Sequence, residues 1–254
     1  MGLDLYAGAL ARYYTGQWET EAQQAGREAG VPVEIFYAGG GPRRLSRLTA
    51  PWRVSTWRRG IRTKYAKVIK EDLNWSEDLS APYFARKPDH AGRLALILAC
   101  AYAEHREFAM PEQLPEDVDA DPAYKAASDK YFASAISVLE CHMFLPSAEN
   151  FVVSEPDPVG NKRFITSIAN LSWALDVVIG AHWQTDPAKI DEWARDAPLG
   201  RKKLLRTDNG EFEVIEEQDF QPESLLSFAH FGFAVYSKAL AFSRDHNVPI
   251  LTDE

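Results

Sequence analysis

Cysteine is scarce in this sequence, because only Cys100 and Cys141 occur among its 254 residues. Both lie in apolar stretches with helical periodicity, which predicts two buried free thiols rather than a disulfide or a reactive thiol. No Cys-x-x-Cys pair and no Cys/His cluster has the spacing of a metal site. The sequence therefore indicates no metal and no cofactor.

Long hydrophobic runs are also missing. No 18 consecutive apolar residues occur, and the longest candidate, residues 93–105, is short and flanked by charge, which predicts a core helix rather than a membrane span. The opening residues lack a basic segment followed by an apolar one, so no signal peptide is indicated. We expect a cytoplasmic protein that does not associate with membranes.

The common catalytic motifs are absent as well. The stretch "GGGPRR" at 39–44 lacks the Lys-Ser/Thr ending of a phosphate-binding loop, and no Gly-x-Ser-x-Gly or His-Glu-x-x-His occurs. Carboxylates are so numerous that no two of them are singled out as an acid/base pair. Whether the protein is an enzyme is left open by the sequence.

Acidic residues are missing from one window, residues 43–70, which contains ten Arg or Lys and no Asp or Glu. The net charge is −9, so the other residues together carry −19. Trp52, Trp57 and Tyr65 are interleaved with the cations, a pattern that nucleic-acid sites share. The acidity of the remaining chain disfavours a polyanion, because the field of the whole protein repels it at long range.

Two other interpretations of the basic window are favoured over nucleic acid. In the first, the window pairs inside the molecule with acidic segments such as residues 112–121 or 211–219. In the second, it binds a protein partner or a small anion, and the candidate anion-binding residues are Arg58, Arg59 and Arg62.

The amino-terminal stretch supplies the other candidate binding residues. Tyr, Trp and Arg contribute most to binding sites, because large rigid rings bury area and keep a polar group. The competing interpretation is that Tyr13 and Trp18 pack in the core while Arg12 pairs with Asp4 or another acid. The candidate residues are Asp4, Tyr6, Arg12, Tyr13, Tyr14 and Trp18.

Hydrophobic periodicity predicts an α+β fold, a predominantly α-helical single domain over residues 1–254 with a few short strands and one β-hairpin. The hairpin is expected around Asn209-Gly210, a pair that favours a type I′ turn. The closing segment "VPILTDE" is expected to return to the sheet or the core. Strands are predicted at 2–8, 33–38 and 150–154, and helices at 17–29, 60–73, 90–107, 122–141, 162–183, 187–197 and 222–245.

Three stretches carry a resemblance to known sequences, namely "MGLDLYAGALARYYTGQWET", "PYFARKPDHAGRLALILACAY" and "ESLLSFAHFGFAVYSKALAFSRDHNVPILTDE". Together they resemble a family of uncharacterised bacterial proteins with a similar start and a Val-Pro-Ile-Leu ending. The resemblance covers about half of the chain. It implies a bacterial cytosolic protein and one folded unit, and it carries no activity and no functional residues.

Two functions follow as expectations. The first is an acidic cytosolic binding protein, of the immunity type that neutralises a toxin, because electrostatic attraction speeds the capture of a basic protein partner. The second is an enzyme that acts on a small anionic substrate, with Arg12, Arg58, Arg59 or Arg62 holding the anion and a Tyr or His transferring protons. The first is the preferred expectation.

Overall fold

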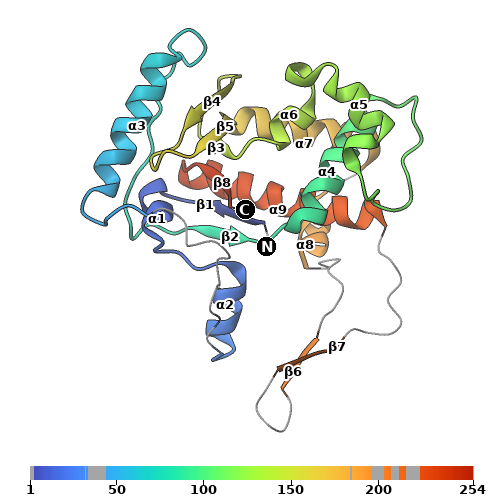
Figure 1. Cartoon of the computed structure of the whole chain (residues 1–254), viewed down its shortest axis with the longest axis horizontal. Helices are drawn as coiled ribbons and strands as arrows, with labels where there is room; N and C mark the ends of the chain where they lie inside the picture. Colours follow the sequence, from blue (N-terminus) through green and yellow to red (C-terminus); the bar gives the residue numbers. More distant parts are fainter. Residues whose placement is uncertain are drawn as a thin grey trace.

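A six-stranded mixed sheet lies at the centre of the computed structural model, which describes residues 3–31, 33, 44–183, 185–195, 203–206, 212–215 and 224–253. The strand order is β2-β1-β8-β3-β5-β4 (Figure 1). Only β3 and β5 run parallel, and every other neighbouring pair is antiparallel. The strands are β1 Asp4–Ala7, β2 Phe84–Arg86, β3 Met143–Leu145, β4 Val152–Pro156, β5 Lys162–Ser167 and β8 Ile250–Asp253.

The helices described by the structure outnumber the strands, as the predicted class requires. Several helices begin at a capping residue whose side-chain oxygen accepts a backbone hydrogen bond from the first turn. Thr20 caps α2 in this way, and Ser224 caps α9. The helices are α1 Leu10–Thr15, α2 Glu21–Glu28, α3 Ala50–Lys64, α4 Asp89–Glu104, α5 Pro122–Ser128, α6 Ala135–Leu139, α7 Ile168–His182, α8 Pro187–Arg195 and α9 Leu225–His246, with 3-10 turns η1 Val118–Ala120 and η2 Tyr131–Ala133.

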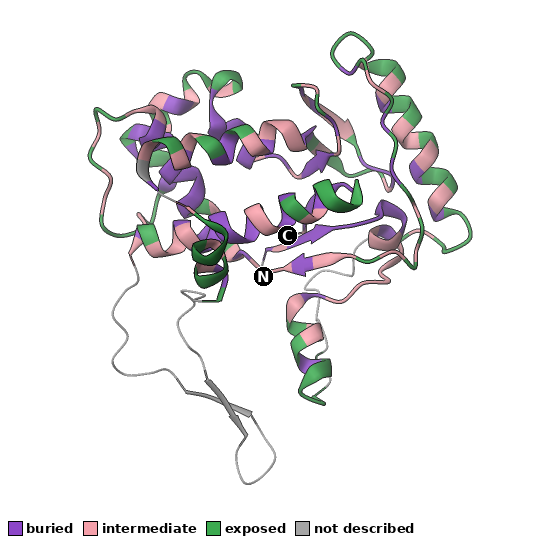
Figure 2. Cartoon of the chain, turned by 180° about the vertical axis from the view of Figure 1, so that it is seen from behind, coloured by how far each residue is buried: buried purple, intermediate pink, exposed green. Residues whose placement is uncertain are grey.

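Alternation along the strands buries both faces of the sheet. In β1, Leu5 belongs to a core with α4, α7 and α9, whereas Tyr6 belongs to a second core with α1 and α3. The same alternation separates Phe144 from Met143 in β3, and Ile250 from Leu251 in β8. The sheet is therefore sandwiched, and Figure 2 shows its strands as mostly buried.

The two longest helices beside the sheet, α4 and α9, cross where both carry glycine. A Cβ atom on Gly232 would lie 2.3 Å from the backbone oxygen of Gly92, a distance that no folded structure tolerates. The absence of a side chain at Gly232 is thus what allows the two backbones to approach.

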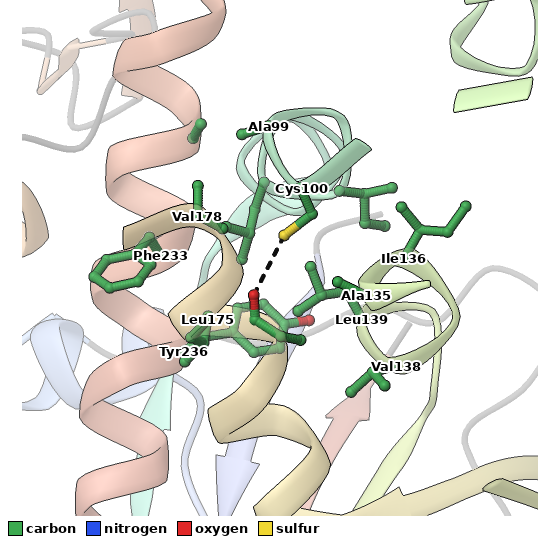
Figure 3. Close-up of a cluster of buried hydrophobic side chains, with 14 of the residues drawn as sticks. Ala99, Cys100, Ala135, Ile136, Val138, Leu139, Leu175, Val178, Phe233 and Tyr236 are labelled. Atoms are coloured by element: carbon green, nitrogen blue, oxygen red, sulfur yellow. Dashed lines mark hydrogen bonds between the residues drawn. The ribbon is translucent and has the colours of Figure 1, made fainter. Parts of the chain in front are cut away.

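The predicted buried thiols are confirmed. Cys100 and Cys141 are free and buried, and burial raises the pKa of the Cys100 thiol. The Cys100 Sγ donates a long hydrogen bond of 3.6 Å to the backbone oxygen of Ala174 in α7, among aliphatic neighbours such as Leu139 and Val178 (Figure 3). Neither thiol has the exposure of a nucleophile.

Several boundaries differ from the predicted ones. Leu10–Thr15 is a helix where none was predicted, because Glu77 satisfies its first turn from a distant loop. The helix predicted at 60–73 is found at Ala50–Lys64 instead. It begins earlier because Pro51 suits the first turn of a helix, and residues 65–73 are not helical. Residues 162–167 form a strand, since Ser167 begins α7 as its N-cap.

Two further predictions need correction or lie partly outside the description. The helix predicted at 122–141 is divided into α5, η2 and α6, because Ser134 caps the last of them. The predicted hairpin pairs β6 Lys203–Arg206 with β7 Phe212–Ile215, but its turn at Asn209-Gly210 lies outside the described residues, as does most of the strand predicted at 33–38. The count of one hairpin was too low, because β4 and β5 form another.

The closing segment returns to the sheet, as predicted. β8 lies between β1 and β3, pairing Asp4 with Asp253 on one side and Met143 with Leu251 on the other. α9, which precedes it, has a mean hydropathy of 1.3 over its most apolar window and is long enough to cross a membrane by length and composition. More than half of that window is buried among the other helices, as in the core helix of many globular proteins.

Candidate functional site

Four of the amino-terminal candidates form one aromatic cluster, which we call the N-terminal cluster: Tyr6, Tyr13, Tyr14 and Trp18, together with Tyr83 from the loop before β2. The Tyr6 ring centre lies 5.2 Å from that of Trp18 and 5.9 Å from that of Tyr83. Tyr6 and Tyr14 are buried, and Tyr13 and Trp18 pack against the same core. The cluster is therefore mainly a packing unit that joins α1 to the sheet.

Arg12 holds two loops against this cluster. Its Nε donates to the backbone oxygen of Gln17 at 2.7 Å, and its Nη1 donates to that of Ala81 at 2.5 Å. Its guanidinium also lies 4.2 Å from the ring centre of Tyr83, a cation–π distance. Arg12 was predicted to pair with Asp4 or another acid. It binds two backbone carbonyl groups and the Tyr83 ring instead.

We expect Arg12→Lys to lower the free energy of unfolding by about 1–2 kcal/mol, because a lysine keeps the charge but cannot donate to both carbonyls and stack on Tyr83. The matched control is Arg59→Lys, whose arginine is exposed and makes only a 3.4 Å contact to the Ser55 oxygen. Urea unfolding of both variants measures the difference. Equal midpoints for the two variants would contradict the bridging role.

Tyr13 connects the cluster to a pair of carboxyl groups. Its hydroxyl donates to Asp253 Oδ1 at 2.5 Å, and Asp253 lies directly opposite Asp4 on the neighbouring strand. Burial, and then the nearby Asp253 charge, raise the pKa of Asp4 to about 6. Burial also raises the pKa of Tyr13 well above its usual range, so its hydroxyl stays protonated and serves as a donor.

Tyr14 points toward a buried ion pair at the other side of the cluster. Burial raises its pKa, and the Asp157 charge raises it further. The Asp157 carboxylate also accepts hydrogen bonds from the backbone of Val159 and Asn161, and Arg163 Nε lies 3.5 Å from its Oδ2. These contacts fix the turn between β4 and β5, which gives Asp157 and Arg163 a structural role.

Glu77 is a site residue that sequence reasoning missed. Its Oε2 accepts a hydrogen bond from the Ala11 backbone at 2.7 Å, and its Oε1 accepts one from Trp75 Nε1 at 2.5 Å. α1 has no capping side chain of its own, so this distant carboxylate satisfies its first turn. Burial raises the pKa of Glu77 to about 7, against the lowering effect of these hydrogen bonds.

A pH dependence follows from Glu77. Its pKa is raised in the folded state, so its contribution to stability is fully present below about pH 4.5 and is lost as the pH rises through about 7. Between pH 5.5 and 8.5 the wild type should lose about 1–3 kcal/mol more unfolding free energy than Glu77→Gln. Asp4 is common to both proteins and cancels. If the unfolding free energies of the two proteins changed equally with pH over this range, the raised pKa assigned to Glu77 would be contradicted.

The three arginines predicted to hold an anion do not act together. Arg58 donates to the Trp75 oxygen at 2.7 Å and lies over the Trp75 ring, while Arg62 donates to the Lys70 oxygen at 2.8 Å. Both therefore fasten the loop that follows α3. Arg59 alone is exposed.

The favoured pairing of the basic window inside the molecule is found for two of its cations, but with acidic residues other than 112–121. In the described part of the chain, its ion pairs run from Lys64 to Glu155 and from Arg62 to Asp72, where the atoms lie 3.8 Å apart. Residues 112–121 lie near α4 and α5, on the other side of the molecule from α3 (Figure 1). The other predicted partner segment, 211–219, is largely outside the described residues.

The structure also has a groove of about 550 Å³, which we call the aromatic groove. Two aromatic side chains stand at it with unusual exposure, Phe132 at 81% and Trp173 at 43%. Asn170, beside them, donates to the Phe151 oxygen at 3.0 Å and to Thr166 Oγ1 at 2.9 Å, which fixes its amide. The lining residues are Phe132, Ala133, Ser137, Val138, Asn150, Phe151, Val152, Asn170 and Trp173.

The lining of the aromatic groove carries no charge, and exposed acidic residues lie close in the sequence to both of its exposed aromatic residues. Exposed Asp176 lies one turn from Trp173 on α7, and exposed Asp129 lies three residues before Phe132. Over residues 107–149 there are nine acidic and two basic side chains, a net charge of −7. One exposed cation, Lys130, also lies between Asp129 and Phe132. The groove is thus an apolar recess in an acidic part of the sequence.

Sequence reasoning missed the aromatic groove, although two signals were available. Ser134 is a good N-cap, which predicts a break beside Phe132. Trp173 shares the helical spacing of Asn170 and Asp176, whereas Leu171, Ala174 and Val178 are the buried positions of α7. Trp173 was therefore on the polar side of its helix.

Within the described residues, no group of three or more His, Cys, Asp or Glu side chains is arranged to hold a metal ion. Comparison with protein-family profiles, with curated proteins and with solved structures finds no match for this chain. The family resemblance of the sequence therefore stays a prediction, and function has to be argued from the surface of the molecule.

Proposed function

We propose that this chain is an acidic cytosolic binding protein that receives a basic protein partner in the aromatic groove. The observation that carries the proposal is the exposure of Phe132 and Trp173, which line the same recess. Large apolar side chains are costly to leave in water, and aromatic residues supply most of the energy at protein interfaces.

The charge around the groove supports a basic partner. The net charge of the chain is −9, and the segment from 107 to 149, which contains the lining residues Phe132, Ala133, Ser137 and Val138, contributes −7 of it. Negative charge on the protein accelerates the encounter with a cationic surface and disfavours acidic competitors. An immunity protein that captures a basic toxin fits this combination, and we retain it as the form of the proposal.

The amino-terminal residues do not line the groove. Arg12, Tyr13 and Glu77 hold α1 and its loops to the sheet. Arg12 is already engaged by two carbonyl groups and a ring, so the alternative function, an enzyme with an anion at this arginine, gains no support from its geometry and stays a prediction.

Capture from the native host tests the proposal. The wild-type chain and a Phe132→Ala/Trp173→Ala variant are immobilised in parallel, and bound proteins are identified after washing at about 150 mM salt. We expect at least one protein with an isoelectric point above 9 that the wild type retains and the variant does not. Retention of the same proteins by both, or of acidic proteins alone, would refute the groove as the binding site.

A further inference from the structure

The outer face of α3 is a second exposed surface, and it is formed by residues different from those of the aromatic groove. Leu48, in the turn before the helix, is 94% exposed, and Trp52 in the first turn is 67% exposed. Arg53 and Arg59 are exposed on the helix beside them. We call these four residues the α3 face.

The opposite side of α3 explains why this face is outward. Ala50, Val54 and Ile61 are buried against α1 and the sheet, which fixes the rotation of the helix. Trp57 Nε1 also donates to the Pro156 oxygen at 2.7 Å, at the end of β4. Helix α3 therefore lies at one edge of the molecule with its outer side exposed (Figure 2).

The cations of the α3 face are not neutralised within the described part of the chain. Lys64 and Arg62 form ion pairs, but no described acidic side chain pairs with Arg47, Arg53 or Arg59. An exposed indole among unpaired guanidinium groups combines the two residue types that contribute most to interface energy. Their positive charge requires a partner with acidic groups.

We propose that the α3 face binds an acidic protein, with Leu48 and Trp52 entering an apolar recess and Arg53 and Arg59 pairing with carboxylates around it. This interaction goes beyond the proposed function, because it assigns a second partner of opposite charge to a separate surface. The local cluster of cations governs the contact at short range, since the field of the distant acidic residues is screened beyond about 8 Å at physiological salt.

Two other classes of anionic partner fit the α3 face less well. Single-stranded nucleic acid stacks successive bases on several rings. Trp52 is the exposed ring here, whereas Trp57 and Tyr65 are engaged with Pro156 and Glu155 of β4. A lipid surface requires a broad apolar helix face, but the apolar side of α3 is already buried in the protein.

Photo-crosslinking tests the proposal on the full chain. Trp52→p-benzoylphenylalanine is irradiated in lysate of the native host, and the crosslinked protein is identified, purified and titrated against the wild type by calorimetry. We expect a protein with an isoelectric point below 6, whose affinity falls 10- to 100-fold in Trp52→Ala and in Arg53→Glu/Arg59→Glu, and weakens as salt is raised.

Two controls separate this proposal from the function of the groove. Phe132→Ala should leave the affinity of the acidic protein unchanged, and Trp52→Ala should leave the capture of the basic partner unchanged. Titrations with 20-nucleotide single-stranded RNA and with vesicles of 70% phosphatidylcholine and 30% phosphatidylglycerol complete the set. Micromolar binding of either that depends on Trp52, crosslinking to a second copy of this chain, or no crosslinked protein would overturn the proposal.

Discussion

Gly232→Ala should lower the free energy of unfolding by about 2–4 kcal/mol, which for a chain of this size corresponds to roughly 5–10 °C in melting temperature. The new methyl group would lie 2.3 Å from the oxygen and 2.8 Å from the carbonyl carbon of Gly92. Both are backbone atoms of α4, so a rotamer change cannot relieve the overlap. The helices α4 and α9 must separate, and the core between them loses contacts.

Gly180→Ala is the matched control for this substitution. Gly180 also lies in a helix, α7, but nothing lies within 4 Å of the position that its Cβ would take. Alanine is the better helix former, so this variant should be unchanged or more stable by about 0.5–1 kcal/mol. Calorimetry of the two variants beside the wild type decides the question. A Gly232→Ala protein as stable as the Gly180→Ala protein would show that α4 and α9 do not approach at these glycines.

Substitution of the two exposed aromatic residues of the aromatic groove should have the largest effect on binding. We expect Phe132→Ala and Trp173→Ala each to weaken the affinity for the basic partner about 10- to 30-fold. The reason is that truncation of a central aromatic residue at an interface costs about 1.4–2 kcal/mol of binding free energy. The stability of Phe132→Ala should change little, because Phe132 is mostly exposed in the free protein. The measurement is calorimetric titration of the partner into each variant.

Leu226→Ala provides the control for the binding measurement. Leu226 is also an exposed apolar residue, at 36%, but it lies on α9 and does not line the aromatic groove. The affinity of the Leu226→Ala protein for the basic partner should equal that of the wild type. An equal loss in all three variants would indicate a general effect of apolar surface rather than binding in the groove.

Much of the fold could be predicted where the local pattern and the tertiary structure agree. The alternation of Leu3, Leu5 and their neighbours predicted the first strand, and the closing segment was expected to return to the sheet, where β8 now lies. The helix predicted to end at residue 29 ends at Glu28, and Gly30, just after it, has a left-handed φ of 71°. In these places the local signal was sufficient, because no distant group was required.

The errors arose where distant residues decide the local structure. The first turn of α1 is capped by Glu77, which is 66 positions away from Ala11 in the sequence. No capping residue near the helix therefore predicts where it begins. The apolar run from 162 onward has helical and strand character alike, and pairing with β3 and β4 makes its first six residues a strand. The one cap that separates strand from helix there is Ser167.

The candidate binding residues show the same division. The sequence grouped five residues as one candidate set, and the structure places their rings and the Arg12 guanidinium in one cluster. The contacts between the rings could not be predicted from the sequence. The residues are Tyr6, Arg12, Tyr13, Tyr14 and Trp18. Burial assigns them to packing and loop fixation. Phe132 and Trp173 are 41 positions apart in the sequence, and only the packing of α6 against both η2 and α7 brings them to one groove.

Amide hydrogen exchange of the free chain and of its complex with the captured basic partner tests the central claim most directly. The account predicts that added protection is concentrated at residues 131–138, 150–152 and 170–176, which border the aromatic groove. Residues 10–18, which include Tyr13, Tyr14 and Trp18 of the N-terminal cluster, should exchange equally in both samples. Protection centred on α1 and α2, with none at the groove, would contradict the account.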